Sequence, residues 1–254
     1  PSRRVSAMMA YDELRDRIVL FGGQEPVGTQ INDTWLYDPA AGQWSPGPAG
    51  PAAAARDRMV YDAARGRVLA FLSSGTYTFD ATGWSLRAPT SSSSPIALAY
   101  DPLRQVVVAA GGGSILEWNG VAWTSRPAAI PSITEPTGYF DPTLGAIVIA
   151  DSSSPGEYWT WNGTTLGHSF VQPVANNRVA FFDSVRGLYV AFGGMVPGGP
   201  SNVTTTGDGL HWTLRQPATS PPARHWAAAA FDSGQGRGIV FGGNSGSTML
   251  GDLW

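Results

Sequence analysis

The chain has 254 residues, a formal net charge of −3 at pH 7 and 43% hydrophobic residues. It contains no Cys, and all 16 of its basic residues are Arg, which excludes thiol nucleophiles, thiolate metal sites, disulfides and Schiff-base lysines. The weakly acidic balance gives no electrostatic reason to expect nucleic acid as a partner. No apolar run is long enough to span a membrane.

Residues 4–44 contain four short runs that are typical of strands. The first covers residues 6–11, the second covers residues 17–21 and ends in Gly22-Gly23, the third covers residues 34–37, and Trp44 marks the fourth. Short β-branched and aromatic runs between Gly, Pro and Asp clusters predict antiparallel β structure.

The rest of the chain repeats this pattern in five edited copies. The first run of each copy ends in an aromatic residue followed by Asp, at Tyr11-Asp12, Tyr61-Asp62, Tyr100-Asp101, Phe140-Asp141, Phe182-Asp183 and Phe231-Asp232. The double glycine recurs at Gly22-Gly23, Gly111-Gly112, Gly193-Gly194 and Gly242-Gly243. One such unit cannot bury both of its faces, so the copies are expected to stack into a single domain over residues 1–254.

The apolar run into Gly22-Gly23, the segment Asn32-Asp33-Thr34-Trp35-Leu36-Tyr37-Asp38 and then Trp44 resemble the Kelch motif. This resemblance implies an all-β fold, a six-bladed β-propeller of four-stranded antiparallel blades. The expected blades cover roughly residues 1–48, 49–89, 90–127, 128–173, 174–217 and 218–254.

The last copy ends inside its third strand, because Gly251-Asp252-Leu253-Trp254 matches Asn32-Asp33-Thr34-Trp35. We therefore expect the last blade to lack its outer strand in this chain. The chain begins at Pro1 without a Met, which favours a processed protein that is secreted or periplasmic, while a cytoplasmic location stays open.

Residues that recur at one structural position are predicted to be scaffold. The aromatic-Asp pairs, with Arg15, Arg65, Arg104 and Arg186 three residues after the Asp, lie at first hairpin turns, where Asp bonds to the backbone. The third-strand aromatics are predicted to pack between blades.

Residues that do not recur are better candidates for a binding site. The positions before each first strand are expected to share one rim of the channel, and they hold the candidate ligand-binding residues Arg4, Arg56, Glu135, Asn177, Arg178, Arg224, His225 and Trp226. Several Arg around one mouth favour a carboxylate-bearing or polyhydroxylated ligand, because guanidinium is a planar fork of donors. On this hypothesis, alanine at both Arg178 and Arg224 abolishes binding and leaves the melting temperature nearly unchanged.

His225 and Glu135 are the best candidates for acid/base catalysis. No second His lies near His225 in the sequence, so no transition-metal site is expected, and no cofactor is expected.

Three functions stay open. The first is a binding propeller for a small anionic or carbohydrate ligand, or for an acidic peptide of a protein partner. The second is a metal-independent small-molecule or carbohydrate-active enzyme, similar to mutarotases or lyases, that acts in the same mouth. The third is a structural repeat module of a larger exported protein. Enzymes that resemble galactose oxidase are excluded, since their copper site needs a Tyr–Cys crosslink and this chain has no Cys.

Overall fold

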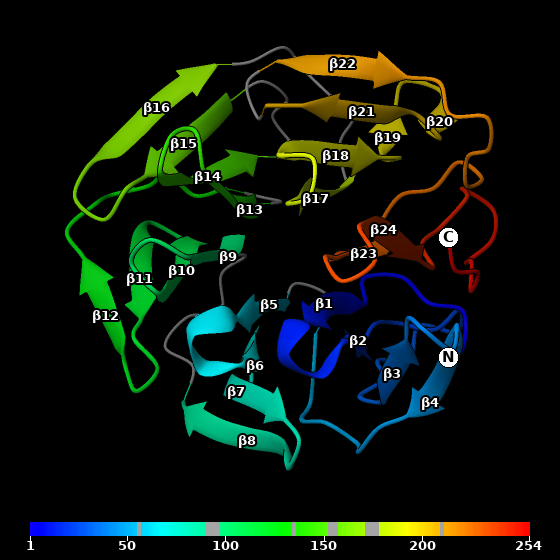
Figure 1. Ribbon diagram of the computed structural model, residues 1–254, viewed down its shortest axis with the longest axis horizontal. Helices are drawn as coiled ribbons and strands as arrows, with labels where there is room; N and C mark the ends of the chain where they lie inside the picture. The colour runs from blue at the N-terminus through cyan, green and yellow to red at the C-terminus, as the bar shows by residue number, and fades with distance from the viewer. Residues whose placement is uncertain (55–56, 90–96, 134–135, 152–156, 171–177, 209–210) are drawn as a thin grey trace. The chain divides into compact units, whose positions relative to one another are not determined.

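The computed structural model describes residues 1–54, 57–89, 97–133, 136–151, 157–170, 178–208 and 211–254, with Asp151 described by its backbone alone (Figure 1). It divides into two compact units. Unit 1 combines residues 1–55 with residues 175–254, and unit 2 covers residues 56–174.

Unit 1 contains two four-stranded antiparallel sheets and the last copy. Blade one has the strand order β1 (Met8–Asp12), β2 (Arg17–Phe21), β3 (Thr34–Asp38) and β4 (Gln43–Pro46). Blade five has the order β17 (Val179–Asp183), β18 (Leu188–Phe192), β21 (Thr204–Gly207) and β22 (Trp212–Arg215). A small hairpin of β19 (Met195–Val196) and β20 (Gly199–Pro200) projects between β18 and β21, and the sixth copy forms β23 (Ala228–Asp232) and β24 (Arg237–Phe241).

Unit 2 contains three four-stranded antiparallel sheets. Blade two consists of β5 (Arg58–Asp62), β6 (Arg67–Leu72), β7 (Gly75–Asp80) and β8 (Gly83–Ala88). Blade three consists of β9 (Ala97–Asp101), β10 (Val106–Gly111), β11 (Ser114–Trp118) and β12 (Trp123–Arg126). Blade four consists of β13 (Pro136–Asp141), β14 (Ala146–Asp151), β15 (Glu157–Trp161) and β16 (Leu166–Phe170). The helices in the described residues are two short 3-10 turns, η1 (Glu13–Arg15) and η2 (Ala63–Arg65).

The protein is therefore an all-β β-propeller of four-stranded antiparallel blades. Within the described residues, five sheets have four strands, and the sixth copy forms the two-stranded sheet β23–β24. The expected third strand of that copy is reduced to a short pairing, in which Trp254 exchanges two backbone hydrogen bonds with Val240, each 2.9 Å. The count of six blades stays a prediction.

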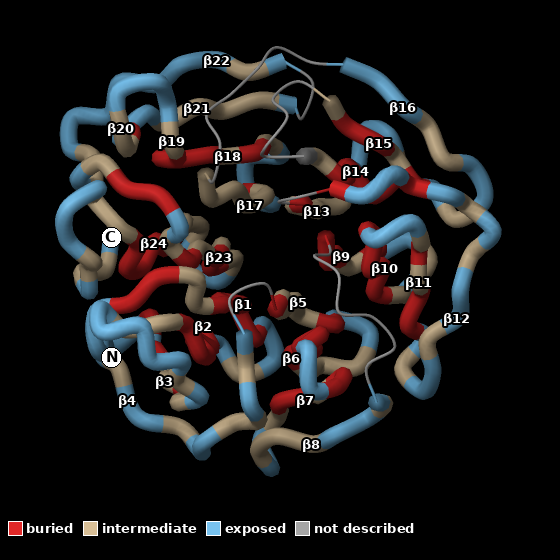
Figure 2. The backbone as a smooth tube through the Cα atoms, turned by 180° about the vertical axis from the view of Figure 1, so that it is seen from behind, coloured by how far each residue is buried: buried red, intermediate tan, exposed pale blue. Residues whose placement is uncertain are grey.

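The hydrophobic core lies between neighbouring blades and over their first two strands. The second strands β2, β6 and β10 are almost fully buried, whereas the outer strands β4, β8 and β12 are mostly half-buried or exposed (Figure 2). In unit 1, Tyr37 of blade one packs in one cluster with Ala230 and Phe241 of the sixth copy. In unit 2, Trp159 and Trp161 of blade four pack against Ile115 of blade three. The prediction that third-strand aromatics pack between blades is confirmed for these residues.

The aromatic-Asp turns have the predicted scaffold role. Each of the six Asp residues is buried. In blades three to five its Oδ1 accepts backbone N–H groups, as Asp183 does from Val185 at 3.1 Å and Arg186 at 2.9 Å. The Asp also pairs with the predicted Arg, as in Arg15–Asp12, Arg65–Asp62, Arg104–Asp101 and Arg186–Asp183, at 2.6–3.2 Å. Because a buried carboxylate needs partners, the motif specifies a tight first hairpin in every copy.

The double glycines allow the backbone of one blade to approach that of the next. Gly193 has φ +73°, and a Cβ there would lie 2.4 Å from the Arg224 carbonyl oxygen. Gly198 also has positive φ, at +112°, but nothing lies within 4 Å of its Cβ position. The two glycines belong to the same loop. Alanine at Gly198 would cause backbone strain alone, whereas alanine at Gly193 would cause strain and a steric clash.

We expect Gly193→Ala to lower the free energy of unfolding by about 3 kcal/mol, because it combines left-handed strain with a backbone overlap. Gly198→Ala is the matched control and should cost about 1 kcal/mol, from strain alone. Urea denaturation of both variants measures the difference. Equal losses would show that the close approach at Gly193 contributes nothing.

Candidate binding rim

The long loops between second and third strands are concentrated in unit 1. They cover residues 22–33 in blade one, 193–203 in blade five and 242–252 in the sixth copy, whereas blades two and three turn through residues 73–74 and 112–113. The segments before the first strands, residues 4–7 and 224–227, lie against these loops through the hydrogen bonds of Val5 with Gln24 and of His225 with Asn244. We call these five segments the unit 1 rim.

Arg4 is buried in the rim, with an exposed fraction of 1%. Its guanidinium forms a bidentate ion pair with Asp33 and also donates to the Gly22 carbonyl, at 3.0 Å. The remaining donors reach the Ser2 carbonyl at 3.1 Å and the Ser2 hydroxyl at 3.0 Å. All five N–H donors of Arg4 are therefore used within the fold.

Arg224 repeats this arrangement in the sixth copy, also with 1% exposure. It forms a bidentate pair with Asp252, 2.7 Å to each carboxylate oxygen, and donates to the Gly242 carbonyl at 2.9 Å and the Pro222 carbonyl at 3.0 Å. We call each of these two groups a latch. One consists of Arg4, Gly22 and Asp33, and the other consists of Arg224, Gly242 and Asp252. Bidentate charge-assisted pairs are the strongest side-chain hydrogen bonds in proteins.

The backbone of each latch arginine connects its own blade to the preceding loop. Arg4 N donates to Leu250 O at 3.1 Å and Arg4 O accepts from Gly243 N at 3.0 Å. Arg224 N donates to Ser201 O at 2.9 Å, and Arg224 O accepts from Gly194 N at 2.8 Å. The two latches therefore join the three long loops into one continuous rim.

The pKa shifts of the two latch carboxyl groups are those expected of stable ion pairs. The hydrogen bond from Arg224 lowers the pKa of Asp252 below its ordinary value, against a smaller opposing effect of burial. Burial raises the pKa of Asp33, but the hydrogen bonds from Arg4 and Trp35 outweigh it, so the net direction is also down. Both carboxylates are ionised at neutral pH, and each neutralises its arginine.

The structure therefore gives two of the predicted ligand-binding arginines a role in the fold. Arg4 has no donor left for a ligand, and Arg224 has at most one. The sequence contains a signal for this, because Arg4 and Arg224 are equivalent positions, as are Asp33 and Asp252, and the pairs occur together in the first and last copies.

Arg178 lies over the sheet of blade five. Its Nη2 donates to the Thr205 hydroxyl at 2.8 Å, and its guanidinium carbon lies 5.6 Å from the centre of the Trp212 ring. Burial lowers the pKa of Arg178 to about 10, so the group stays charged at neutral pH. Its Nε and Nη1 atoms have no hydrogen-bond partner among the residues that the structure describes.

His225 and Trp226 are the remaining predicted residues in the described part of the rim. Trp226 is 44% exposed, and its backbone adopts the left-handed conformation, with φ 53°. Its ring lies against the His225 imidazole, with the centroids 4.4 Å apart and the planes at 59°. Arg56, Glu135 and Asn177, the other three predicted residues, lie outside the described residues.

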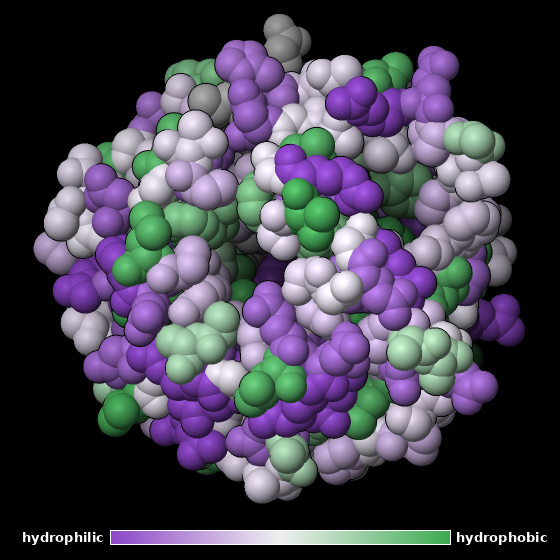
Figure 3. Space-filling model, in the orientation of Figure 1, coloured by the Kyte–Doolittle hydropathy of each residue, from purple (hydrophilic) through white to green (hydrophobic). Residues whose placement is uncertain are grey.

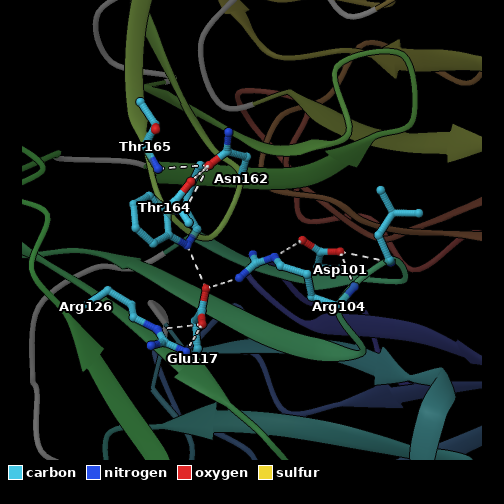
Figure 4. A network of polar contacts seen from close by, with 9 residues as sticks. Asp101, Arg104, Glu117, Arg126, Asn162, Thr164 and Thr165 are labelled. Atoms are coloured by element: carbon cyan, nitrogen blue, oxygen red, sulfur yellow. Dashed lines mark hydrogen bonds and ion pairs between the residues drawn. The ribbon is translucent and has the colours of Figure 1, made fainter.

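Sequence reasoning missed a buried polar network in unit 2 (Figure 4). The Glu117 side chain is 3% exposed, and Arg104 and Arg126 approach it from two sides, with Arg126 Nε at 2.7 Å. Trp161 Nε1 also donates to Glu117 Oε1, at 2.7 Å. The network joins blade three to blade four, and the Glu117 carboxylate accepts from Arg104, Arg126 and Trp161. It is a structural connection.

Hydrophilic and hydrophobic residues are interspersed over the face seen in Figure 3, and no large hydrophobic patch stands out there. Within the described ranges, no three His, Asp or Glu side chains gather as a metal ion would require. Neither short helix in the described part of the chain could cross a membrane.

A family model of the Kelch motif matches residues 9–51, which cover blade one from β1 to just beyond β4. Blade one carries a Kelch motif. Together with the β-propeller fold, this match is consistent with a Kelch-repeat family, as the resemblance implies. No curated protein matches the chain.

Proposed function

We propose that this Kelch propeller is a binding module and that its ligand lies on the unit 1 rim at Trp226. A Kelch propeller in general suggests a binding module. The observation that carries the choice of site is Trp226 itself. A large side chain in the left-handed region is uncommon and costs about 1–2 kcal/mol.

The equivalent residue in blade one shows that the scaffold does not need a tryptophan. Ser6 has the same left-handed conformation, with φ 55°, and its N–H donates to the Trp226 carbonyl at 3.0 Å. A small polar residue therefore satisfies the same backbone geometry. An exposed indole at this position supports a contact with a ligand, because Trp is enriched where proteins bind their partners.

The ion pairs of the latches affect which class of ligand the rim would bind. Since Arg4 and Arg224 are neutralised by Asp33 and Asp252, an arginine-based site for a carboxylate has less support than a site for a polyhydroxylated ligand. The alternative of an enzyme in the same place rests on His225, because Glu135 lies outside the described residues.

We also propose that the sixth copy is the sixth blade. β23 packs beside β1 and beside β17 in unit 1. Ala228, Ala230, Ile239 and Phe241 of the sixth copy share one buried cluster with Met9, Tyr11, Ile18, Leu20 and Tyr37 of blade one. This is the packing that neighbouring blades of a propeller have.

We expect Trp226→Gly to abolish ligand binding and to change the free energy of unfolding by no more than about 1 kcal/mol. Relief of the left-handed strain offsets the loss of ring packing on His225. The wild type and the variant are compared on a glycan array and a random-peptide display library, and their stability is measured in urea.

Phe170→Ala is the matched control, since Phe170 is an exposed aromatic residue on β16 in unit 2. It should keep every interaction of the wild type. Binding that is weakened equally by Phe170→Ala and Trp226→Gly, or by neither, would place the ligand elsewhere.

A further inference from the structure

The side chain of His225 is an unexplained polar group beside Trp226. His225 is 7% exposed, and its Nδ1 is enclosed without a hydrogen-bond partner among the described residues. Its backbone N–H and carbonyl are both used, in the pair with Asn244 at 3.0 and 2.8 Å. The backbone of His225 is thus held in place, and one nitrogen of its imidazole has no hydrogen-bond partner among the described residues.

Two unfavourable features coincide in consecutive residues. A buried polar atom without a partner destabilises a fold, and so does a bulky residue at positive φ. The equivalent residues of blade one, Val5 and Ser6, avoid both, because Val5 has no polar side-chain atom and Ser6 is small. Unfavourable features of this kind gather at binding sites, where a ligand can relieve them.

We infer that His225 and Trp226 form a subsite for a neutral sugar ring, in which the indole stacks on the ring and His225 Nδ1 hydrogen-bonds to one of its hydroxyl groups. This inference rests on the proposed function and adds the ligand class and the second contact.

The chemistry of the two side chains complements a sugar. The face of an indole is large, apolar and rigid, which suits the C–H face of a pyranose ring. A hydroxyl group both donates and accepts, so it pairs with Nδ1 in either tautomer of the imidazole. Burial lowers the pKa of His225 below 6.5, with a smaller opposing effect of the Asn244 backbone, and the imidazole is therefore neutral at neutral pH.

The charges around the subsite favour a neutral ligand. Arg224, the residue before His225, is neutralised by Asp252, and Arg4 is neutralised by Asp33. A sugar acid or an acidic peptide would therefore gain little from these arginines, which keep their own carboxylates.

A turn of the Trp226 ring opens the subsite. Nδ1 is closed to solvent, and the Trp226 ring is the aromatic group packed on the imidazole. Trp226 is half-exposed, and exposed side chains change rotamer within nanoseconds. The backbone stays in place, since the Trp226 carbonyl is held by the Ser6 N–H.

The test uses isothermal titration of the full chain with cellotetraose, xylotetraose, mannotetraose and maltotetraose. At least one should bind the wild type. His225→Leu should weaken that binding by at least tenfold. His225→Asn should restore it to within about threefold, because the Asn amide stands at the position of Nδ1, whereas His225→Gln places its amide at the position of Nε2 and should not. Thermal melts check that each variant is folded.

Three results would overturn the inference. The first is that none of the four sugars binds the wild type. The second is that His225→Leu or His225→Gln binds as tightly as wild type, and the third is that His225→Asn binds as weakly as His225→Leu. The proposed function is judged separately: peptides or acidic glycans that bind wild type and not Trp226→Gly would support the rim as a binding surface while excluding a neutral sugar.

Discussion

Glu117→Ala should lower the free energy of unfolding by about 3–5 kcal/mol. It leaves the half-buried Arg126 without its carboxylate, and it leaves the half-buried Arg104 with Asp101 alone. Arg104 and Arg126 both pair with Glu117, and the Trp161 indole N–H donates to it. The variant therefore removes a connection between blades three and four as well as a buried charge. Guanidinium denaturation measures the loss.

Thr78→Ala is the matched control for Glu117→Ala. Thr78 occupies the equivalent place in β7 and accepts a hydrogen bond from Arg87 Nε at 2.8 Å, where Glu117 accepts from Arg126. It is fully buried but carries no charge, so its loss should cost about 1 kcal/mol. Similar losses for the two variants would show that the charge of Glu117 does not stabilise the fold.

The effect of Glu117 should also depend on pH. Burial raises the pKa of Glu117, but the hydrogen bonds from Arg104 and Trp161 outweigh it, so the pKa lies below the ordinary 4.5. A carboxylate with a lowered pKa stabilises the fold above the unfolded pKa, and this contribution is lost as the pH falls through the folded value. The stability difference between wild type and Glu117→Ala should therefore shrink below about pH 4.5.

Arg224→Ala should lower the free energy of unfolding by about 3 kcal/mol, because it removes the ion pair of Asp252 and the donor of two carbonyl oxygens. The Asp252 carboxylate then keeps only the Trp254 indole N–H as a side-chain donor among the described residues. The matched control is Arg186→Ala, since Arg186 is 58% exposed at the side chain in its pair with Asp183. A pair whose arginine is exposed contributes about 1 kcal/mol or less, and without Arg186 the buried Asp183 still accepts the backbone N–H groups of residues 185 and 186. Thermal and urea unfolding of both variants provide the comparison.

This expected result reverses the hypothesis drawn from the sequence, in which replacing Arg178 and Arg224 leaves the melting temperature nearly unchanged. If Arg224→Ala is as stable as wild type, the latch does not hold the rim, and a direct role of Arg224 in ligand binding becomes the better reading.

The repeat could be predicted from the sequence because its signals are local. In blades three, four and five, the Asp at the end of the first strand accepts backbone N–H groups two and three residues ahead, as Asp183 does from Val185 and Arg186. The continuous apolar runs of β2 and β6 and the positions of Gly22-Gly23 and Gly193-Gly194 are local signals as well. Such interactions are visible without knowledge of the neighbouring blade.

The roles of the rim residues were decided by tertiary structure. Arg4 and Asp33 are 29 residues apart in the chain, Arg224 and Asp252 are 28 apart, and Glu117 and Trp161 are 44 apart. The position of a residue within the repeat indicates whether it lies near the rim. Which charged residue it pairs with depends on how the loops approach one another after folding. Once the carboxylates meet Arg4 and Arg224, those arginines become scaffold. Trp226 and His225, which differ from Ser6 and Val5 on the same backbone, then remain as the residues that the fold itself does not require.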